Sequence, residues 1–211
     1  LGAIRAQAKV SSFSISEAPT TVGQYRRCVE AGACGKPSRK SLSCVAGHGA
    51  TGATYADQGR AETPVTCATP KQAEAFCAWV GGRLPTVEEW MLAVRGPTIQ
   101  RFAWGDHAPS CTQHWAALAG AGDCCGKDCM DPATASVGQH TDGNSPSGIG
   151  DVLSTPAELI GSSASSTLSA CKGTRCLATG TEPGAIDSVI PVPESVERGP
   201  STDFERTAGF R

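Results

Sequence analysis

Eleven cysteines are the residues of this 211-residue chain with the most evident chemistry. Thiols at this density are a liability in a reducing cytosol, whereas an oxidising compartment converts them into cross-links. We therefore expect an exported protein that is secreted, periplasmic or displayed at the cell surface. Because the number of cysteines is odd, at least one thiol has no partner within the chain.

Metal and nucleophile patterns are sparse elsewhere. The run 123–129 holds three cysteines, a spacing that also suits Zn²⁺, but no second spaced pair accompanies it. The histidines show neither a His-x-x-x-His spacing nor an adjoining carboxylate, so we expect scattered surface residues rather than an iron site. They are His48, His107, His114 and His140. No Gly-x-Ser-x-Gly, P-loop or Rossmann fingerprint supports a hydrolase or nucleotide-binding function.

The charge balance excludes two classes of partner. Lys and Arg number 18 against 20 Asp and Glu, for a formal charge of -2. No basic run offers the clustered cations that bind nucleic acid or an anionic membrane. No apolar run approaches the ~20 residues that span a bilayer, so we expect no transmembrane segment in this chain. We therefore favour another protein as the binding partner of this chain.

Three capping boxes predict where the helices begin. In each one a Thr precedes a Gln or Glu by three residues, so that side chains and backbone amides cap one another. The pairs are Thr21 with Gln24, Thr69 with Gln72, and Thr86 with Glu89. Apolar residues at helical spacing follow each box. We therefore expect helices near residues 21–31, 70–80 and 87–95.

The remaining segments predict little regular structure. Loose alternation over residues 10–15 favours a first strand, and the polar, Gly-rich stretch 35–63 favours an irregular loop. After residue 97, short apolar pieces separated by Gly, Pro, Asp and Ser indicate strands and long loops. Helices followed by a mostly β second half are typical of an α+β fold. No clean linker divides the chain, so we expect one domain over residues 1–211.

Several of these segments carry a family signature. The chain resembles the formylglycine-generating enzyme (sulfatase-modifying factor) family in three central runs and in flanking motifs. The runs are 64–67, 73–79 and 82–90, and the flanking motifs are 21–25, 102–106 and 209–211. The resemblance implies a variant of the C-type lectin fold, with two to three helices on small twisted antiparallel sheets and much irregular loop.

The joint between the second and third helices is the most specific part of the resemblance. Arg83 follows a helix-ending Gly pair, where it would reach back to unpaired carbonyls of that helix. Pro85 fixes the turn, and Thr86 opens the next helix. We interpret this joint as architecture rather than as a catalytic site.

The resemblance also bears on catalysis. Some members of the family oxidise a cysteine of sulfatases to formylglycine with copper held by two cysteines, others are iron-dependent C–S bond-forming enzymes, and many are non-catalytic binding modules. Cys171 and Cys176 have the five-residue spacing of the copper ligands but come several residues too early, and no cysteine follows them. Copper(I) requires soft thiolates, so we expect a pseudoenzyme. The alternative is a copper-dependent formylglycine-generating oxidase that uses Cys171 and Cys176 on a cysteine of a protein substrate.

A structural Ca²⁺ is a further implication of the resemblance. The corresponding ligands are Asp151, the backbone carbonyls of Ser154 and Pro156, and Glu158, all hard oxygen donors. A solvated acidic loop is the competing interpretation. The family's second calcium site is lost, since Ala117 stands at its Asn position. Because the resemblance implies a lectin-type fold and this first Ca²⁺ site, a calcium-dependent glycan-binding lectin is another alternative function.

The resemblance and local spacing together suggest the disulfides. The expected pairs are Cys28–Cys34, Cys44–Cys67, Cys111–Cys124 and, outside the copper alternative, Cys171–Cys176; Cys125 with Cys129 is also possible. Cys77 matches a family cysteine whose usual partner is missing here, so we expect it to be buried and free or paired elsewhere. Residues 177–208 form either a variable contact surface or a plain extended connector.

These observations favour one function. We expect a non-catalytic, disulfide-stabilised binding or assembly module outside the bacterial cytoplasm, acting as an accessory subunit of an envelope or extracellular complex.

Overall fold

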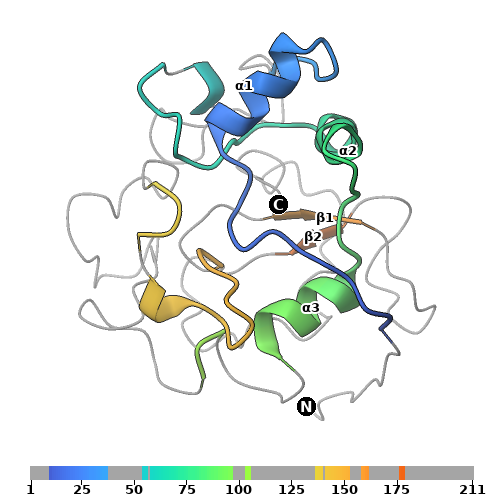
Figure 1. Cartoon of the computed structure of the whole chain (residues 1–211), viewed down its shortest axis with the longest axis vertical. Coiled ribbons are helices and arrows are strands. Elements are labelled where there is room, and N and C mark those ends of the chain that lie inside the picture. The colour runs from blue at the N-terminus through green and yellow to red at the C-terminus, as the bar shows by residue number, and fades with distance from the viewer. Residues whose placement is uncertain are drawn as a thin grey trace.

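The computed structural model describes residues 10–37, 54–56, 58–96, 103–105, 136–139, 141–152, 158–161 and 176–178. Within these residues the fold is a mixed α+β arrangement of three α-helices, two 3-10 turns and a two-stranded sheet (Figure 1). The 3-10 turns are η2 (Thr54–Ala56) and η4 (Thr141–Gly143). No helix in the described part is long and apolar enough to cross a membrane.

The three helices begin at the predicted caps. They are α1 (Val22–Glu30), α2 (Pro70–Trp79) and α3 (Val87–Arg95), and a complete capping box precedes each. In the first box the amide of Gln24 donates to the Thr21 hydroxyl at 3.2 Å, while the Thr21 amide donates to the Gln24 side chain at 2.9 Å. These local bonds satisfy amides that lack a partner in the first helical turn.

The start of α1 is held against the segment that precedes α2. The amide of Val22 donates to the Thr63 carbonyl at 2.9 Å, and the Val65 amide donates to the Thr20 carbonyl at 2.8 Å. Gly23 donates to the Ala61 carbonyl at 2.8 Å, and a Cβ at Gly23 would lie 3.1 Å from that oxygen. A glycine therefore allows the close approach.

Two buried threonines tie η2 to the same segment. The Thr54 amide donates to the Thr66 hydroxyl at 3.2 Å, and the Thr66 amide donates to the Thr54 hydroxyl at 3.1 Å. The Thr54 hydroxyl lies 2.7 Å from the carbonyl of Pro64, to which it donates. The described part of the predicted irregular stretch 35–63 therefore contains the ordered turn η2, whose first residue Thr54 is buried. Reciprocal bonding satisfies polar groups that this burial would otherwise penalise.

The sheet consists of β1 (Glu158–Ile160) and β2 (Cys176–Ala178), which pair antiparallel with Leu159 opposite Leu177. Figure 1 places this pair between α2 and α3. The Gly161 amide donates to the Pro85 carbonyl at 2.8 Å, which joins the end of β1 to the turn before α3. The expected small antiparallel sheet is thus present in the described part of the second half.

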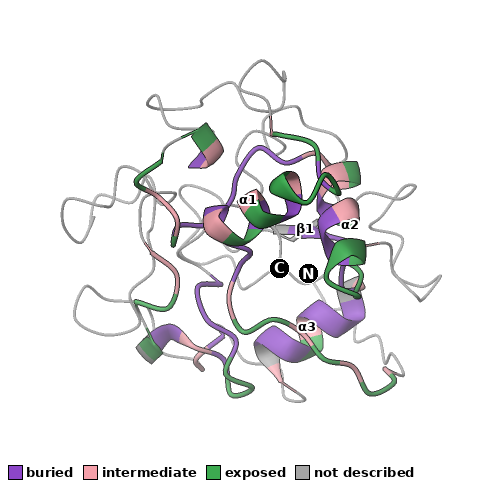
Figure 2. Ribbon diagram, turned by 45° about the horizontal axis from the view of Figure 1, so that its top comes forward, coloured by how far each residue is buried: buried purple, intermediate pink, exposed green. Residues whose placement is uncertain are grey.

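Two hydrophobic clusters form the core, and the buried segments in Figure 2 follow them. One joins α1, α2 and β1: Val22, Tyr25, Cys28, Cys34, Val65, Ala68, Ala73, Phe76, Cys77, Leu84 and Leu159. The other surrounds α3: Trp90, Ala93, Val94, Ala103, Ile149, Val152 and Ile160. In the first, the rings of Tyr25 and Phe76 stack with centroids 5.7 Å apart. Neighbouring residues of β1 enter different clusters because adjacent side chains of a strand point to opposite faces.

The predicted first strand near residues 10–15 is not formed. This segment carries no strand pairing, although its burial alternates as the sequence suggested. Phe13 and Ile15 pack against the cluster around α3, while Ser12 and Ser14 are exposed. Alternation reports which side chains are buried, whereas a strand also requires a neighbour for its backbone. No such neighbour lies among the described residues.

Candidate functional site

The joint between α2 and α3 is built around an ion pair. The Arg83 guanidinium donates to both carboxylate oxygens of Glu89 at 2.7 Å each. The Thr86 amide also donates to Glu89, at 2.8 Å. Hydrogen bonds from Arg83 and Thr86 hold the pKa of Glu89 at about 2, below its usual 4.5 and against the opposing effect of burial. The same carboxylate therefore caps α3 and anchors Arg83.

The expected direction of Arg83 was wrong. The side chain does not bond the carbonyls that end α2; it points toward α3 and donates to the Leu84 carbonyl at 3.1 Å in addition to Glu89. A bidentate bond between two charged groups is stronger than a bond to a neutral carbonyl. The role assigned to the joint, as architecture, agrees with these contacts.

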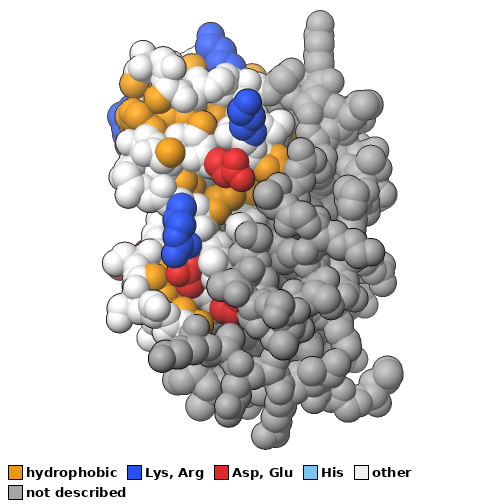
Figure 3. Space-filling model, turned by 90° about the vertical axis from the view of Figure 1, so that its right-hand side faces the viewer, with side chains coloured by type: hydrophobic (Ala, Val, Ile, Leu, Met, Phe, Trp, Pro, Cys, Tyr) orange, Lys and Arg blue, Asp and Glu red, His pale blue; other side chains and the backbone are white. Residues whose placement is uncertain are grey.

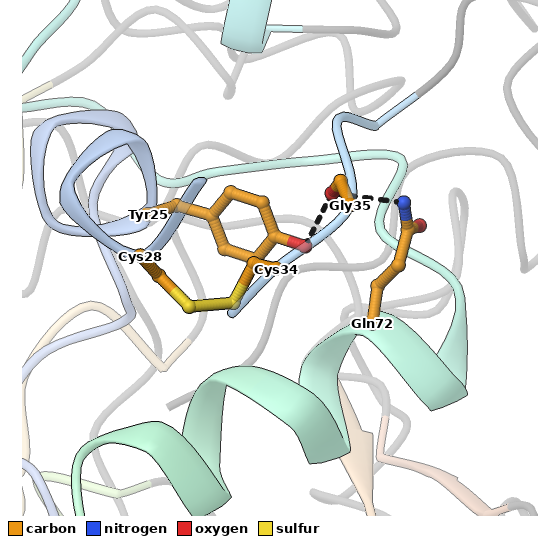
Figure 4. Close-up of a disulfide and its surroundings, with 5 residues drawn as sticks. All are labelled: Tyr25, Cys28, Cys34, Gly35 and Gln72. Atoms are coloured by element: carbon orange, nitrogen blue, oxygen red, sulfur yellow. Dashed lines mark hydrogen bonds between the residues drawn. A yellow bond between two sulfur atoms is a disulfide. The ribbon is translucent and has the colours of Figure 1, made fainter. Parts of the chain in front are cut away.

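A disulfide pins the end of α1. Cys28 and Cys34 are bonded, as expected, and Figure 4 shows them beside Tyr25. The Tyr25 hydroxyl donates to the Gly35 carbonyl at 2.9 Å, and Gln72 of α2 donates to the same carbonyl at 3.1 Å. Burial and the neighbouring Tyr55 raise the pKa of Tyr25 to about 12, so the phenol remains a neutral donor.

Cys77 is the free cysteine of the described residues. It lies in α2, is 4% exposed and belongs to the core cluster of that helix. Burial, with a smaller contribution from Glu74, raises the pKa of this thiol to about 11. Nucleophilic and metal-binding chemistry requires the thiolate, so Cys77 packs as a small buried apolar group. This agrees with the expectation that Cys77 is buried and free or paired elsewhere.

A groove of about 690 Å³ opens between the N-terminal segment and the helices. One wall is residues 12–16, and the others come from α1, the end of α2 and the joint. Phe76 and Trp79 of α2 contribute apolar surface, and their rings are 5.9 Å apart. Trp79 and the adjacent Val80 remain 40% and 58% exposed. On the side where α2 lies, Figure 3 shows hydrophobic side chains at the surface among acidic and basic ones.

The sequence did not predict this groove. Its wall at residues 12–16 and its wall at the end of α2 come from segments 60 or more residues apart in the sequence (76 − 16 = 60). Spacing along the chain does not reveal that such distant segments meet. One signal was present: the alternation over residues 10–15 without an evident partner strand. A second was the apolar pair Trp79 and Val80 directly before the Gly pair, which the structure leaves partly exposed.

The expected calcium ligands are described only in part. Asp151 is buried, and its Oδ2 accepts the Gly138 amide at 2.7 Å. Ser154 and Pro156 lie outside the described residues, as does the side chain of Glu158. Ca²⁺ takes six to eight oxygens, so the single described carboxylate does not amount to a calcium site. The described residues also contain no cluster of three or more His, Cys, Asp or Glu that would hold a metal.

The remaining predicted thiol sites lie mostly beyond the described side chains. Cys67 is disulfide-bonded, but its predicted partner Cys44 is outside the described residues. The pair Cys111–Cys124 is outside them, as is Cys171. For Cys176 only the backbone is described, opposite Ile160 in the sheet. The four histidines, Ala117 and the run 123–129 are likewise outside.

Comparison with known proteins identifies relatives for much of this scaffold. A family model described as the sulfatase-modifying factor enzyme 1-like domain matches residues 3–180. Over 47 residues the chain is 47% identical to a formylglycine-generating enzyme of Mycobacterium tuberculosis, covering 22% of this chain and 16% of that protein. Over 56 residues it is 45% identical to the inactive C-alpha-formylglycine-generating enzyme 2 of Bos taurus, covering 26% and 19%.

A hercynine oxygenase of Mycolicibacterium thermoresistibile is 38% identical over 96 residues, which is 44% of this chain and 19% of that protein. The aligned parts thus span less than a fifth of these three relatives. Their names include active and inactive proteins, so similarity alone does not assign an activity.

Proposed function

Because the chain belongs to the sulfatase-modifying factor family, we propose that it is a non-catalytic binding or assembly module of that family. It acts outside the bacterial cytoplasm as an accessory subunit of an envelope or extracellular complex. The family includes a relative named as inactive, to which this chain is 45% identical over 56 residues. A non-catalytic member therefore has a precedent.

The observation that carries the proposal is a retained scaffold combined with missing thiols. The joint keeps its Arg83–Glu89 pair and all three helices keep their capping boxes. In contrast, residues 177–211 contain no cysteine, although the resemblance places the copper ligands there. Copper(I) binds through soft thiolate ligands. A fold can be retained while the residues of its functional site change and serve another function.

The properties of Cys77 support the same proposal. It is the described cysteine that lines the groove, and a pKa of about 11 keeps it protonated near neutral pH. A buried thiol of this kind supports packing rather than metal binding or nucleophilic attack.

The proposal includes the C-type lectin variant of the α+β fold and an extracytoplasmic location. The small antiparallel sheet and the capped helices support the fold. The Cys28–Cys34 disulfide and the bonded Cys67 support the location, since disulfides persist in oxidising compartments. A structural Ca²⁺ at Asp151, Ser154, Pro156 and Glu158 remains part of the proposal. A rise in melting temperature on adding Ca²⁺ to chelator-treated protein, absent in Asp151→Asn, would support it, whereas equal melting temperatures would contradict it.

The deciding experiment is an oxidation assay. The purified chain is incubated with copper, a thiol reductant, oxygen and a sulfatase-type cysteine peptide, and the peptide mass is followed. We expect no formylglycine. A known formylglycine-generating enzyme serves as the positive control, and the double variant Cys171→Ser/Cys176→Ser as the matched negative. Formylglycine made by the unmodified chain and lost in the double variant would refute the proposal in favour of the copper alternative.

A further inference from the structure

The start of α2 depends on a disulfide that lies just before it. Cys67 is disulfide-bonded and 1% exposed, and its partner lies outside the described residues. Two residues later Thr69 caps α2. One residue earlier the Thr66 amide donates to the Thr54 hydroxyl of η2 at 3.1 Å. The backbone at Cys67 therefore sets the direction of the chain between the contact with η2 and the cap of α2.

The Cys28–Cys34 disulfide reaches the same helix start through one side chain. Gly35 follows this disulfide directly, and its carbonyl accepts a hydrogen bond from the Gln72 side chain at 3.1 Å (Figure 4). The oxygen of the same side chain accepts the Thr69 amide at 2.9 Å, which completes the capping box of α2. Two disulfides therefore converge on the first turn of α2.

Cys67 holds a backbone conformation that its side chain disfavours. Its φ is 64°, in the left-handed region, and among the described residues other than glycine only Asp151 shares a positive φ. A Cβ makes this region unfavourable by about tenfold relative to the right-handed one. Such a conformation persists where the surrounding structure holds it, and it is common in segments that switch. Neither Cys28 nor Cys34 has a positive φ, so the two disulfides differ in backbone strain.

We propose that the disulfide at Cys67 is a redox-sensitive switch that controls the start of α2. A dithiol reductant delivers two electrons and two protons. One thiolate attacks the disulfide, the second displaces the first from the mixed disulfide, and the reductant closes to its own disulfide while Cys67 and its partner become thiols. Released from the cross-link, Cys67 returns to a favoured φ, and the capping box of α2 and the Thr54–Thr66 contacts open. Because strain favours reduction, this disulfide is reduced before Cys28–Cys34.

The division of the described core into two clusters keeps this opening local. The cluster joining α1, α2 and β1 contains the Cys28–Cys34 disulfide and Ala68, the neighbour of Cys67. The cluster around α3 contains no cysteine among its described members, and its Trp90 is 1% exposed. Proteins open in cooperative units of unequal stability. The unit around the start of α2 therefore loosens while the unit around α3 remains packed.

The first test is a redox equilibrium of the full-length oxidised protein without denaturant. The protein is equilibrated at pH 7 with mixtures of reduced and oxidised dithiothreitol and quenched with acidic N-ethylmaleimide, and each cysteine peptide is quantified by mass spectrometry. We expect Cys67 to be half reduced at a ratio of reduced to oxidised reagent about tenfold lower than Cys28–Cys34. Burial of Cys67 slows access of the reagent but does not change the end point. Simultaneous reduction, or earlier reduction of Cys28–Cys34, would overturn the proposal.

Hydrogen exchange tests whether reduction reaches α2. In protein reduced at Cys67 only, the amides of Thr54, Thr66 and Gln72, which donate to side chains, should exchange about tenfold faster. The Trp90 amide of α3 is the internal control and should keep its exchange rate. Unchanged exchange at the three amides would show that the cross-link does not control the start of α2. Equal acceleration at Trp90 would show global unfolding, and either result would refute a local switch.

Two substitutions separate backbone strain from loss of the cross-link. Cys67→Gly and Cys67→Ala both remove the disulfide, but Gly adopts a positive φ without strain whereas Ala does not. We expect the Gln72 amide to stay protected in Cys67→Gly and to exchange about tenfold faster in Cys67→Ala. The matched pair Cys34→Gly and Cys34→Ala should not show this order, because Cys34 has no positive φ. Equal exchange in the two Cys67 variants, or faster exchange in Cys67→Gly, would contradict the proposal.

Discussion

Replacing Glu89 by Gln isolates the charge in the joint between α2 and α3. The capping boxes of α1 and α2 use Gln24 and Gln72 at the position that Glu89 holds in α3. A Gln at residue 89 should therefore still accept the Thr86 amide and preserve the helix start. What it removes is the bidentate ion pair with Arg83.

The size of the effect follows from the pKa of Glu89. The usual pKa is 4.5 and the pKa in the folded protein is about 2, a difference worth at most about 3.4 kcal/mol at 1.36 kcal/mol per pKa unit. The Arg83 side chain is 64% exposed, and solvent screening weakens such a pair, which reduces the expected loss to about 1–2 kcal/mol.

The pH dependence has a definite sign. Because the folded pKa lies below the unfolded one, the stabilisation is fully present above about pH 4.5 and is lost as the pH falls toward 2. Urea unfolding at pH 7 should therefore separate the unmodified chain from Glu89→Gln by about 1–2 kcal/mol, and the two curves should converge near pH 2.

Glu74→Gln is the matched control, since Glu74 is exposed on α2. We expect it to change the free energy of unfolding by less than about 0.5 kcal/mol. A difference between the unmodified chain and Glu89→Gln that stays constant from pH 7 to pH 2 would refute the reasoning. The cost would then come from damaged capping rather than from the ion pair.

Three further predictions concern the buried contacts. Replacing Cys28 and Cys34 together by Ala should lower the free energy of unfolding by about 2 kcal/mol, because the loop they close is short; an unchanged urea midpoint would contradict this. Iodoacetamide at pH 8 should label Cys77 only in denaturant, because burial keeps the thiol protonated. Rapid labelling of Cys77 in the folded protein, detected by mass spectrometry, would contradict it. Thr66→Val should cost about 1–3 kcal/mol by leaving the Thr54 amide unpaired, while Thr66→Ser retains most of the stability; equal melting temperatures for the two variants would contradict it.

Local pattern predicted the helices well and the N-terminal segment poorly. A capping box is complete within four residues, so its outcome does not depend on distant packing, and all three boxes formed. Residues 10–15 show the burial alternation expected from their sequence, but strand pairing depends on a second segment. Arg83 donates to Glu89 rather than to the backbone carbonyls that end α2, because the carboxylate is the better acceptor. The position of Arg83 after the Gly pair did not predict this partner.

The sequence alone determined where α1, α2 and α3 begin, that Cys28 lies within bonding reach of Cys34, and that residues 177–211 contain no thiol. Each of these depends on residue identity and short spacing. Tertiary structure alone decided that residues 12–16, α1 and α2 enclose a groove, and that Cys77 is a buried, protonated thiol on its wall. Burial and charge compensation are properties of segments brought together by folding, and spacing along the chain does not encode them directly.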